Sequence, residues 1–300
     1  MDSLNYSHVH PDFRLVFALS DDERIAFLDK PRWVGYPLAT EVLDELTNLL
    51  NQPKQPRMRN LLIVGDSNNG KTTVIRRFHE MHLPSNESTD EKSNEGVICP
   101  VVLAEAPPKP DEKGLYVSIL DRLCVPYRPN DTSVNLRHQV IKVLRTLRTR
   151  MLIIDEFHSI LTGPMLKQRE AMNVLKYLCN ELMIPIVGVG TREAMRVLHT
   201  DPQHASRFEV KALKNWDFNQ EFLKLLAKFE TTLPLKKPSK LHDQRVARSL
   251  HAISDGNLGN LRRLIAVCAK SAIRKGTEQI TEEIVQSHAG MRPTRGIREI

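Results

Sequence analysis

The chain has 300 residues, 41% of them hydrophobic, and its 43 Lys and Arg against 36 Asp and Glu give a net charge of +7. This size allows one large α/β domain and a smaller one, and the positive charge favours an acidic partner, nucleic acid before membrane. The apolar runs are too short to span a bilayer, and the polar start predicts that there is no signal peptide. The four cysteines are widely separated, which predicts free thiols in a cytoplasmic chain.

Residues 1–55 are predicted to form a helical N-terminal segment. Ser20 and Glu23 have the spacing of a capping box, which would open a helix that runs through Leu28. Apolar residues then recur at helical spacing from Ala39 to Leu50, which predicts a second helix.

The apolar run Leu61–Val64 leads directly into the pattern G-x-x-x-x-G-K-T, which ends at Thr72. A buried strand, a glycine-rich turn and a following helix place backbone N–H groups around a phosphate, and a chance surface turn would not combine all three. Lys71 would reach the β- and γ-phosphates and the Thr72 hydroxyl would bind Mg²⁺. The nucleotide-binding residues expected here are Gly65, Asp66, Ser67, Asn68, Asn69, Gly70, Lys71, Thr72 and Thr73.

Strands and helices alternate in the rest of the core, from residue 56 to residue 215. A polar loop at 84–96 precedes a predicted strand at 97–104, and further strands are expected at 151–155, 184–190 and 208–213. Helices are expected at 72–82, 113–124, 134–147 and 166–182. This order predicts a five-stranded parallel sheet covered by helices on both faces.

The strand at 151–155 ends in two acids, Asp155 and Glu156. In phosphate-loop enzymes such a strand ends beside the phosphate loop, so Asp155 would hold Mg²⁺ and Glu156 would orient and polarise the attacking water. The alternative is an acid pair that only caps the surface end of a strand.

Three further polar residues are candidates for the same site. Thr191 ends the next strand and could contact the γ-phosphate or the water as a sensor, or simply cap the following helix. Arg207 precedes the last strand and is a candidate arginine finger that reaches a neighbouring subunit, or else it faces solvent. Arg262, near the start of a later helix, could contact the nucleotide or lie on a solvated face.

Only helices are predicted after Trp216, at 218–231, 244–253, 257–275 and 281–288, so residues 216–290 should form a small all-α lid domain. Residues 291–300 carry three arginines and read as a basic tail that contacts DNA or a partner, or as a disordered end.

In this order the motifs resemble those of AAA+ ATPases. The segments Arg32–Pro37 (R-W-V-G-Y-P), Asn60–Thr72 (N-L-L-I-V-G-D-S-N-N-G-K-T) and Asp155–His158 (D-E-F-H) resemble the TniB/TnsC family of bacterial transposition regulators, over residues 8–290. The resemblance implies an AAA+ fold that uses ATP and Mg²⁺ and assembles as a homo-oligomeric ring or filament on duplex DNA. It would link a TniQ-like target selector to a DDE transposase, and ATP hydrolysis would disassemble it.

The resemblance also implies roles for individual residues. Trp33, Tyr36 and Pro37 would line the adenine, although ordinary core packing would explain the two aromatic residues as well. In ring ATPases the loops around the helices after the second strand face the pore, and here these loops carry Lys109, Lys113, Thr132 and Arg137. Basic side chains and a hydroxyl there would bind DNA phosphates without reading sequence. The basic outer face of the helix at 134–147 is a weaker candidate, because such a face is often only solvated.

Two other functions share the nucleotide motifs. A helicase loader or replication initiator would carry the same phosphate loop and the same acids. A DNA-binding scaffold with a relic phosphate loop is disfavoured, because Lys71, Thr72, Asp155 and Glu156 are all present.

Overall fold

The structure is a computed structural model that describes residues 6–87, 96–109, 111–198 and 206–291. The predicted basic tail from residue 292 onward and the stretch 201–205 before Arg207 lie outside the described residues. The chain divides into two compact units. An α/β unit comprises residues 37–67 and 71–213, and a helical unit comprises residues 1–36, 68–70 and 214–300.

The α/β unit is built on a five-stranded sheet with the order β4-β5-β6-β1-β7. The strands are β1 (Asn60–Gly65), β4 (Val101–Glu105), β5 (Met151–Asp155), β6 (Ile186–Gly190) and β7 (Phe208–Leu213). All four neighbouring pairs are parallel, so the strands share one carboxyl edge. The predicted five-stranded parallel sheet is therefore confirmed, and polar groups that follow its strands gather at one edge.

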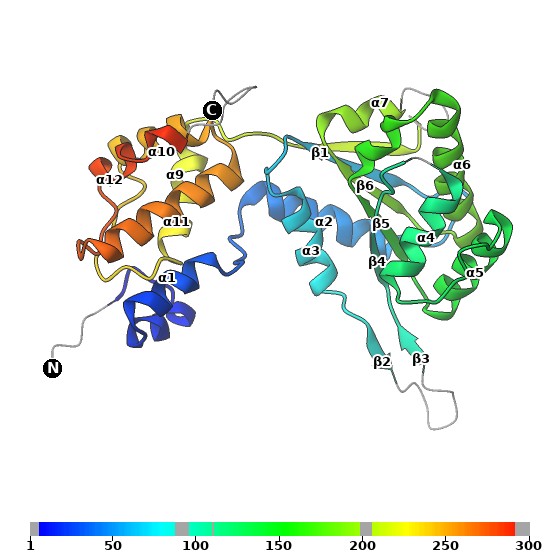
Figure 1. Cartoon of the computed structure of the whole chain (residues 1–300), viewed down its shortest axis with the longest axis horizontal. Coiled ribbons are helices and arrows are strands. Elements are labelled where there is room, and N and C mark those ends of the chain that lie inside the picture. The colour runs from blue at the N-terminus through cyan, green and yellow to red at the C-terminus, as the bar shows by residue number, and fades with distance from the viewer. Residues whose placement is uncertain (1–5, 88–95, 110, 199–205, 292–300) are drawn as a thin grey trace. The chain divides into compact units, whose positions relative to one another are not determined.

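Helices cover both faces of this sheet (Figure 1). On one face lie α2 (Pro37–Asn51) and α3 (Lys71–Glu80), which pack on each other, and α3 also contacts β1, β4 and β6. On the other lie α4 (Glu112–Arg122), α5 (Ser133–Thr146) and α6 (Met165–Leu182). Leu62 and Val64 of β1 belong to the same buried core as these three helices, which holds β1 against this layer. Short elements η2 (Phe157–Thr162), η3 (Arg192–Ala194) and α7 (Met195–Leu198) follow β5 and β6.

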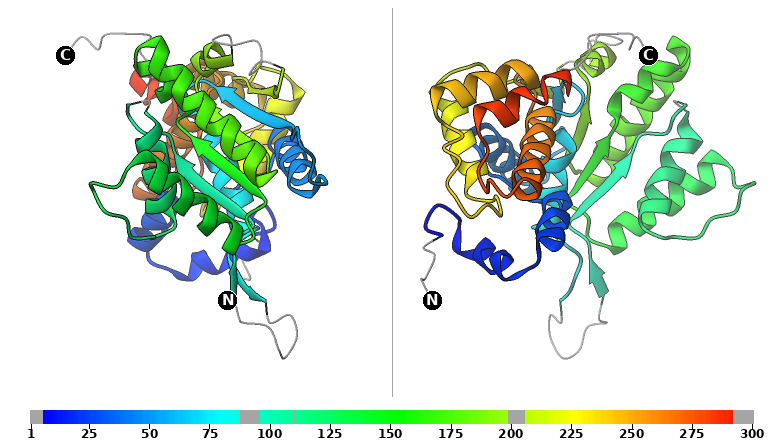
Figure 2. Two further views of the ribbon diagram at one scale, coloured as in Figure 1. Left: turned by 90° about the vertical axis from the view of Figure 1, so that its right-hand side faces the viewer. Right: turned by 60° about the vertical axis from the view of Figure 1, so that its left-hand side comes forward.

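The single strand predicted at 97–104 is wrong, because the chain forms two separate strands there. β3 (Gly96–Ile98) pairs antiparallel with β2 (Ser85–Glu87), whereas β4 joins the main sheet from Val101. Pro100 lies between them and has no N–H to give to a ladder, and its carbonyl accepts from the N–H groups of Arg150 and Met151 instead. The two views of Figure 2 show β2 and β3 beyond the end of the main sheet.

The helical unit contains α1 (Asp21–Asp29), α9 (Gln220–Glu230), α10 (Gln244–Ser254), α11 (Leu258–Arg274) and α12 (Glu282–Gln286), with 3-10 turns at η1 (Pro11–Ala18) and η4 (Ala289–Met291). The predicted capping box is present at α1, where Ser20 and Glu23 each accept from the other's backbone N–H. Side chains also cap the later helices, at Asn219, Asp243, Asn257 and Thr281. Local sequence signals therefore set where these helices begin.

A buried ion pair ties α1 into the helical unit. The guanidinium of Arg24, which is fully buried, donates to both carboxylate oxygens of Glu278 and to the carbonyl of Pro234. Burial alone would raise the pKa of Glu278, but hydrogen bonds from Arg24 and from the Lys236 N–H outweigh it and lower that pKa. Helix α1 also packs against α11, so the chain's beginning and end share one core.

Among the described helices, none combines the length and the apolar character needed to cross a bilayer.

Candidate nucleotide site

The phosphate loop leaves the buried strand β1 in a conformation that its glycines and asparagines permit. Asn68 has φ +63° and Gly70 has φ +82°, a region that glycine and asparagine tolerate best. A Cβ at Gly65 would stand 2.5 Å from the carbonyl oxygen of Leu213 on the neighbouring strand β7. Glycine is therefore required at the first position of the loop so that β1 and β7 can approach each other.

Lys71 begins α3 and points back over the loop. Its Nζ donates to the carbonyl oxygens of Gly65 at 3.0 Å and Asp66 at 2.8 Å, and only 9% of the residue is exposed. Burial lowers the pKa of Lys71, and the nearby charges of Glu156, Asp155 and Asp66 oppose that shift. The ammonium is thus held at the start of the phosphate loop, where it is available to phosphate oxygens.

Thr72 and Asp155 meet across the sheet edge. The Thr72 hydroxyl donates to Asp155 Oδ2 at 2.9 Å, and Oδ1 of the same carboxylate accepts the Glu156 N–H at 2.9 Å. The strand β6 lies between β1 and β5, so this pair spans the width of one intervening strand. A hydroxyl and a carboxylate are hard oxygen donors of the kind that Mg²⁺ prefers, so the residues fit the ion. The last residue of the predicted phosphate set, Thr73, faces solvent.

Glu156 follows β5 in a left-handed backbone conformation, with φ +53°. Its side chain is about half exposed at 47%, and its Oε2 lies 3.3 Å from His158 Nε2. The other ring nitrogen, His158 Nδ1, is buried without a hydrogen-bond partner among the described residues. His158 belongs to the D-E-F-H segment, but nothing in the sequence predicts that its ring turns back to Glu156 or gives it a role.

Thr191 ends β6, between the strands that carry the loop and the two acids. It stands at the start of η3, yet its side chain makes no capping hydrogen bond. The Thr191 hydroxyl is buried and has no partner within the described part of the chain. The simple capping role is therefore not realised, and the hydroxyl is available for a ligand at the carboxyl edge of the sheet.

Arg192 is a residue of this edge that sequence reasoning missed. Its Nε lies 2.8 Å from Oδ1 of Asp66 and its Nη2 donates to Oδ2 at 3.1 Å, so the pair is bidentate. Both side chains are partly exposed, at 58% and 40%. The pair connects the loop to the residue after Thr191, and no local signal joins positions 126 residues apart.

Arg207 lies at the opposite end of the sheet from the phosphate loop. It directly precedes Phe208, which pairs with Asn60 at the start of β1, whereas the loop follows Gly65 at its end. Six strand residues separate these positions, about 20 Å at the usual rise per residue. Arg207 donates to Asn180 Oδ1 at 2.8 Å, and the register keeps it away from the phosphate loop of its own chain.

The aromatic candidates of the helical unit are packed rather than free. Tyr36 is 5% exposed and meets Trp216 edge to face with ring centroids 5.3 Å apart, and burial raises its pKa to about 12. Trp33 is half-buried, and Pro37 is exposed and opens α2, where a first-turn proline is favourable. The core-packing alternative thus accounts for Tyr36.

Arg262 is exposed on α11, and its Nη2 donates to the carbonyl of Lys30 at 3.2 Å. It lies beside Arg32, whose guanidinium donates to the Thr232 carbonyl and stacks on Phe27 at 4.3 Å. Burial, helped by repulsion from Arg262, lowers the pKa of Arg32 to about 10. Two cations therefore share this corner of the helical unit.

Residues 68–70 of the loop cluster with the helical unit, at the first turn of α11. The Gly259 N–H donates to the Asn68 carbonyl at 2.9 Å, and the Asn68 side-chain amide donates to Asn260 Oδ1 at 3.0 Å. A Cβ at Gly259 would stand 2.1 Å from Asn68 Oδ1. Close approach to the loop therefore explains the glycine at position 259.

The predicted DNA-binding residues lie around the first turns of α4 and α5. Lys109 is exposed, and Lys113 donates to the Pro129 carbonyl at 2.6 Å and lines a groove with Ser133 and Lys167. Thr132 caps α5, since its hydroxyl oxygen accepts the Asn135 N–H, which leaves the hydroxyl hydrogen free to be donated.

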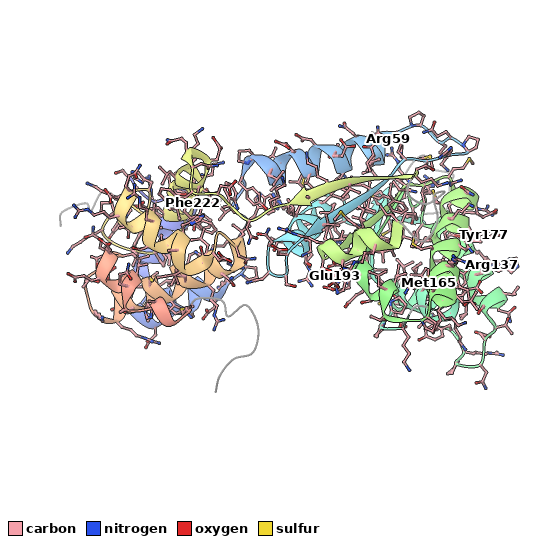
Figure 3. The ribbon with its side chains drawn as sticks, turned by 90° about the horizontal axis from the view of Figure 1, so that it is seen from above. Arg59, Arg137, Met165, Tyr177, Glu193 and Phe222 are labelled. Carbon is pink, nitrogen blue, oxygen red and sulfur yellow. The ribbon has the colours of Figure 1, made fainter. Side chains whose placement is uncertain are left out.

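Arg137 is placed differently from the other three. Its guanidinium lies over the Tyr177 ring, 5.2 Å from the centroid, and Figure 3 shows the two side chains together at α5 and α6. The structure therefore places Lys113 in a groove that is lined by acids as well as by Lys167, puts Thr132 next to that groove at the start of α5, and engages Arg137 with an aromatic ring.

Comparison with known proteins identifies a family and a fold. The family model described as "Bacterial TniB protein" matches residues 24–218, and no curated protein matches the chain. Among solved structures, the ORC2 protein of Aeropyrum pernix in its ADPNP–ADP complexes has a TM-score of 0.62 at 17% identity, covering 91% of this chain and 72% of that one. Cdc6p of Pyrobaculum aerophilum has a TM-score of 0.60 at 17% identity, covering 94% and 73%.

A third similar structure is Drosophila ORC bound to DNA, with a TM-score of 0.58 at 15% identity, covering 89% of this chain and 65% of that one. At these identities the likeness establishes the fold, which is the predicted AAA+ arrangement of a parallel α/β sheet followed by helices.

Proposed function

Since the chain belongs to the TniB family, we propose that it is an ATP-hydrolysing regulator of DNA transposition. The proposed ATPase activity rests on the hydrogen bond between the Thr72 hydroxyl and Asp155. Thr72 follows the buried Lys71 in sequence, and Asp155 precedes Glu156. A loop that only bound phosphate would need Lys71 and the loop N–H groups, whereas hydrolysis also needs the acids at this edge.

The proposed site uses each group in a separate role. Loop N–H groups and Lys71 bind the β- and γ-phosphates, while Thr72 and Asp155 hold Mg²⁺, which neutralises phosphate charge. Glu156 accepts a proton from the water that attacks the γ-phosphorus as the bond to the β-phosphate oxygen breaks. The unpartnered hydroxyl of Thr191 donates to the γ-phosphate or to that water.

We assign Arg207 to the nucleotide of a neighbouring copy. Its position at the far end of β7 supports this role, because the register separates it from its own loop. An arginine supplied from a second subunit stabilises the charge of the transition state. Oligomerisation, in a ring or filament, is then a condition for full activity.

The partners proposed are duplex DNA, a TniQ-like selector and a DDE transposase. The positive net charge, the exposed Lys109 and the free hydroxyl hydrogen of Thr132 support sequence-independent contact with phosphates. In this proposal ATP binding drives assembly on DNA, and hydrolysis releases the chain once the transposase has been recruited. Trp33, Tyr36, Pro37 and Arg262 remain candidates for the adenine and sensor contacts.

The test is Glu156→Gln, compared with Lys71→Ala and the unaltered chain. We expect Glu156→Gln to bind ATP with Mg²⁺ normally, to hydrolyse it at least a hundredfold more slowly, and to stay assembled on duplex DNA in electron micrographs. Lys71→Ala should fail to bind ATP and to assemble. Failure of Glu156→Gln to bind ATP, or an ATP-bound chain that remains monomeric on DNA, would contradict the proposal.

The second candidate is a replication initiator or helicase loader, which the shared fold with the ORC2 protein and Cdc6p favours. The two functions separate in a strand-transfer assay with a purified DDE transposase. Stimulation of DNA joining that depends on ATP supports the transposition regulator, whereas loading of a replicative helicase without such stimulation supports the alternative.

A further inference from the structure

The side chain of His158 contacts the carboxylate proposed to activate water. The chain turns into η2 at Phe157, and this turn brings Nε2 of His158, three residues after Asp155, to 3.3 Å from Glu156 Oε2. Glu156 is 47% exposed on a short connection, so its carboxylate needs a partner to keep one orientation. Lys71 acts on Glu156 only through its charge, and it donates to the loop carbonyls instead.

Close packing fixes the ring of His158 from the other side. A Cβ at Gly190, at the end of β6, would stand 3.1 Å from the His158 backbone nitrogen and 3.4 Å from Nδ1. The missing side chain at Gly190 therefore makes room for the histidine, and the ring fits between β6 and Glu156. A Cβ at position 190 would be tight against the His158 backbone, which would have to shift by a few tenths of an ångström.

The two ring nitrogens differ in their surroundings, and this difference selects a tautomer. Nδ1 is buried without a partner among the described residues, so a proton there would leave a buried N–H with no acceptor. Nε2 faces a carboxylate oxygen, which accepts hydrogen bonds and has none to donate when ionised. Of the two tautomers of the ring, the arrangement favours the one with its proton on Nε2.

We propose that His158 is a positioning residue for hydrolysis, whose Nε2–H holds Oε2 of Glu156 so that the other carboxylate oxygen faces the attacking water. The histidine touches neither the nucleotide nor the water, and it acts only through the orientation of Glu156. This inference rests on the proposed ATPase function, because an oriented base matters only where a water is activated.

The first test compares three replacements of His158. The amide nitrogen of glutamine reaches about as far as Nε2, whereas that of asparagine reaches only as far as Nδ1. We expect kcat for ATP hydrolysis to fall about tenfold in His158→Ala and His158→Asn, and to recover within about threefold of the unaltered chain in His158→Gln. KM, the affinity for a non-hydrolysable ATP analogue and the thermal midpoint should stay unchanged in all three.

Equal losses in all three variants, or losses that come with weaker analogue binding, would show a merely structural role and overturn the proposal. The same holds if His158→Ala lowers the residual single-turnover rate of Glu156→Gln as much as it lowers that of the unaltered chain. A positioning residue should have almost no further effect once its carboxylate is gone.

The second test needs no nucleotide and is independent of the proposed function. Nitrogen-15 NMR of the imidazoles in the full chain should show His158, identified by its absence in His158→Gln, protonated on Nε2, and Glu156→Ala should weaken this preference. A proton on Nδ1 would overturn the inference. An unaltered chain that hydrolyses no ATP but shows the Nε2–H tautomer would contradict the ATPase proposal and leave the contact established.

Discussion

The hydroxyl of Thr72 donates a hydrogen bond of 2.9 Å to Oδ2 of Asp155, which joins the first turn of α3 to the end of β5. Both oxygens belong to the proposed Mg²⁺ site. Thr72→Val keeps the shape of the side chain and removes the hydroxyl, so we expect ATP affinity in the presence of Mg²⁺ to fall at least tenfold. Affinity measured with EDTA should change far less, and titration calorimetry can follow both.

Thr146, exposed at the end of α5, provides the matched control for this substitution. Thr146→Val should bind ATP as the unaltered chain does, with and without Mg²⁺. An equal loss of affinity for Thr72→Val in both conditions would place the hydroxyl outside the metal site.

The ion pair between Asp66 and Arg192 leads to a prediction about charge in the phosphate loop. Arg192→Ala leaves the Asp66 carboxylate unpaired beside a triphosphate, so we expect affinity for an ATP analogue to fall about threefold, as for a partly exposed pair. Asp66→Asn combined with Arg192→Ala should restore it. Fluorescence titration with a labelled analogue measures both variants.

Arg196→Ala, on the next helix α7, tests whether loss of any nearby cation has the same effect. It should bind the analogue normally. If Arg192→Ala instead tightened binding, the ion pair would be a barrier to the nucleotide.

The two lysines proposed to contact DNA near the first turn of α4, Lys109 and Lys113, predict a particular salt dependence. Each phosphate contact contributes about 0.9 to the slope of log K against log salt concentration, so Lys109→Ala with Lys113→Ala should reduce that slope by about 2. ATP binding should be unaffected. Thr132 is better replaced by serine than by alanine, because losing the helix cap alone costs about 1 kcal/mol.

The competing surface is the outer face of α5. Lys142→Ala with Arg145→Ala removes the same number of positive charges there, and it should leave the slope unchanged. A loss of slope in this second pair rather than the first would move the DNA to that face.

Glu278 makes the stability of the helical unit depend on pH. Its pKa is lower in the folded chain than the ordinary value near 4.5, so its ionised form stabilises the fold fully above that pH. This contribution is lost as pH falls through the lowered pKa. Glu278→Gln leaves the buried Arg24 with only the exposed carboxylate of Asp21 as a charged partner, and we expect it to reduce the free energy of unfolding by about 3 kcal/mol at pH 7 and by less near pH 4.

Urea unfolding can be followed by tryptophan fluorescence, because the chain's two tryptophans, Trp33 and Trp216, both lie in this unit. The control is Glu221→Gln, which breaks an exposed pair with Lys224 and should cost less than about 1 kcal/mol at any pH. If Glu278→Gln reduced the free energy of unfolding by the same amount at every pH, the lost contribution would come from packing rather than from charge.

The sequence allowed the sheet to be predicted because its strands are short apolar runs between clear helix caps. It also indicated which strand ends would meet, since parallel strands share a carboxyl edge. It did not indicate that Pro100 ends one strand and lets another begin. A proline inside an apolar run affects hydrogen bonding and leaves the hydrophobic pattern unchanged.

The contacts in the site that could not be predicted from the sequence are those that depend on the direction in which a side chain points. Asp66 with Arg192 is remote in sequence, and both residues could equally have faced solvent. Glu156 with His158 is local, yet only the turn into η2 and the space at Gly190 direct the ring backwards. Sequence patterns predict which residues belong to a helix or a strand, whereas side-chain rotamers and close packing determine whether these two pairs come into contact.

The role proposed for Arg207, which precedes β7 and is remote from the loop after β1, implies a particular symmetry for the proposed assembly. Two copies related by a two-fold axis would present the same surface to each other. One copy that offers an arginine to the nucleotide of the next uses two different surfaces, which is a head-to-tail contact. Such a chain of copies has a direction, because its two ends differ. At one end Arg207 has no neighbouring nucleotide, and at the other end the bound nucleotide has no arginine from a neighbour.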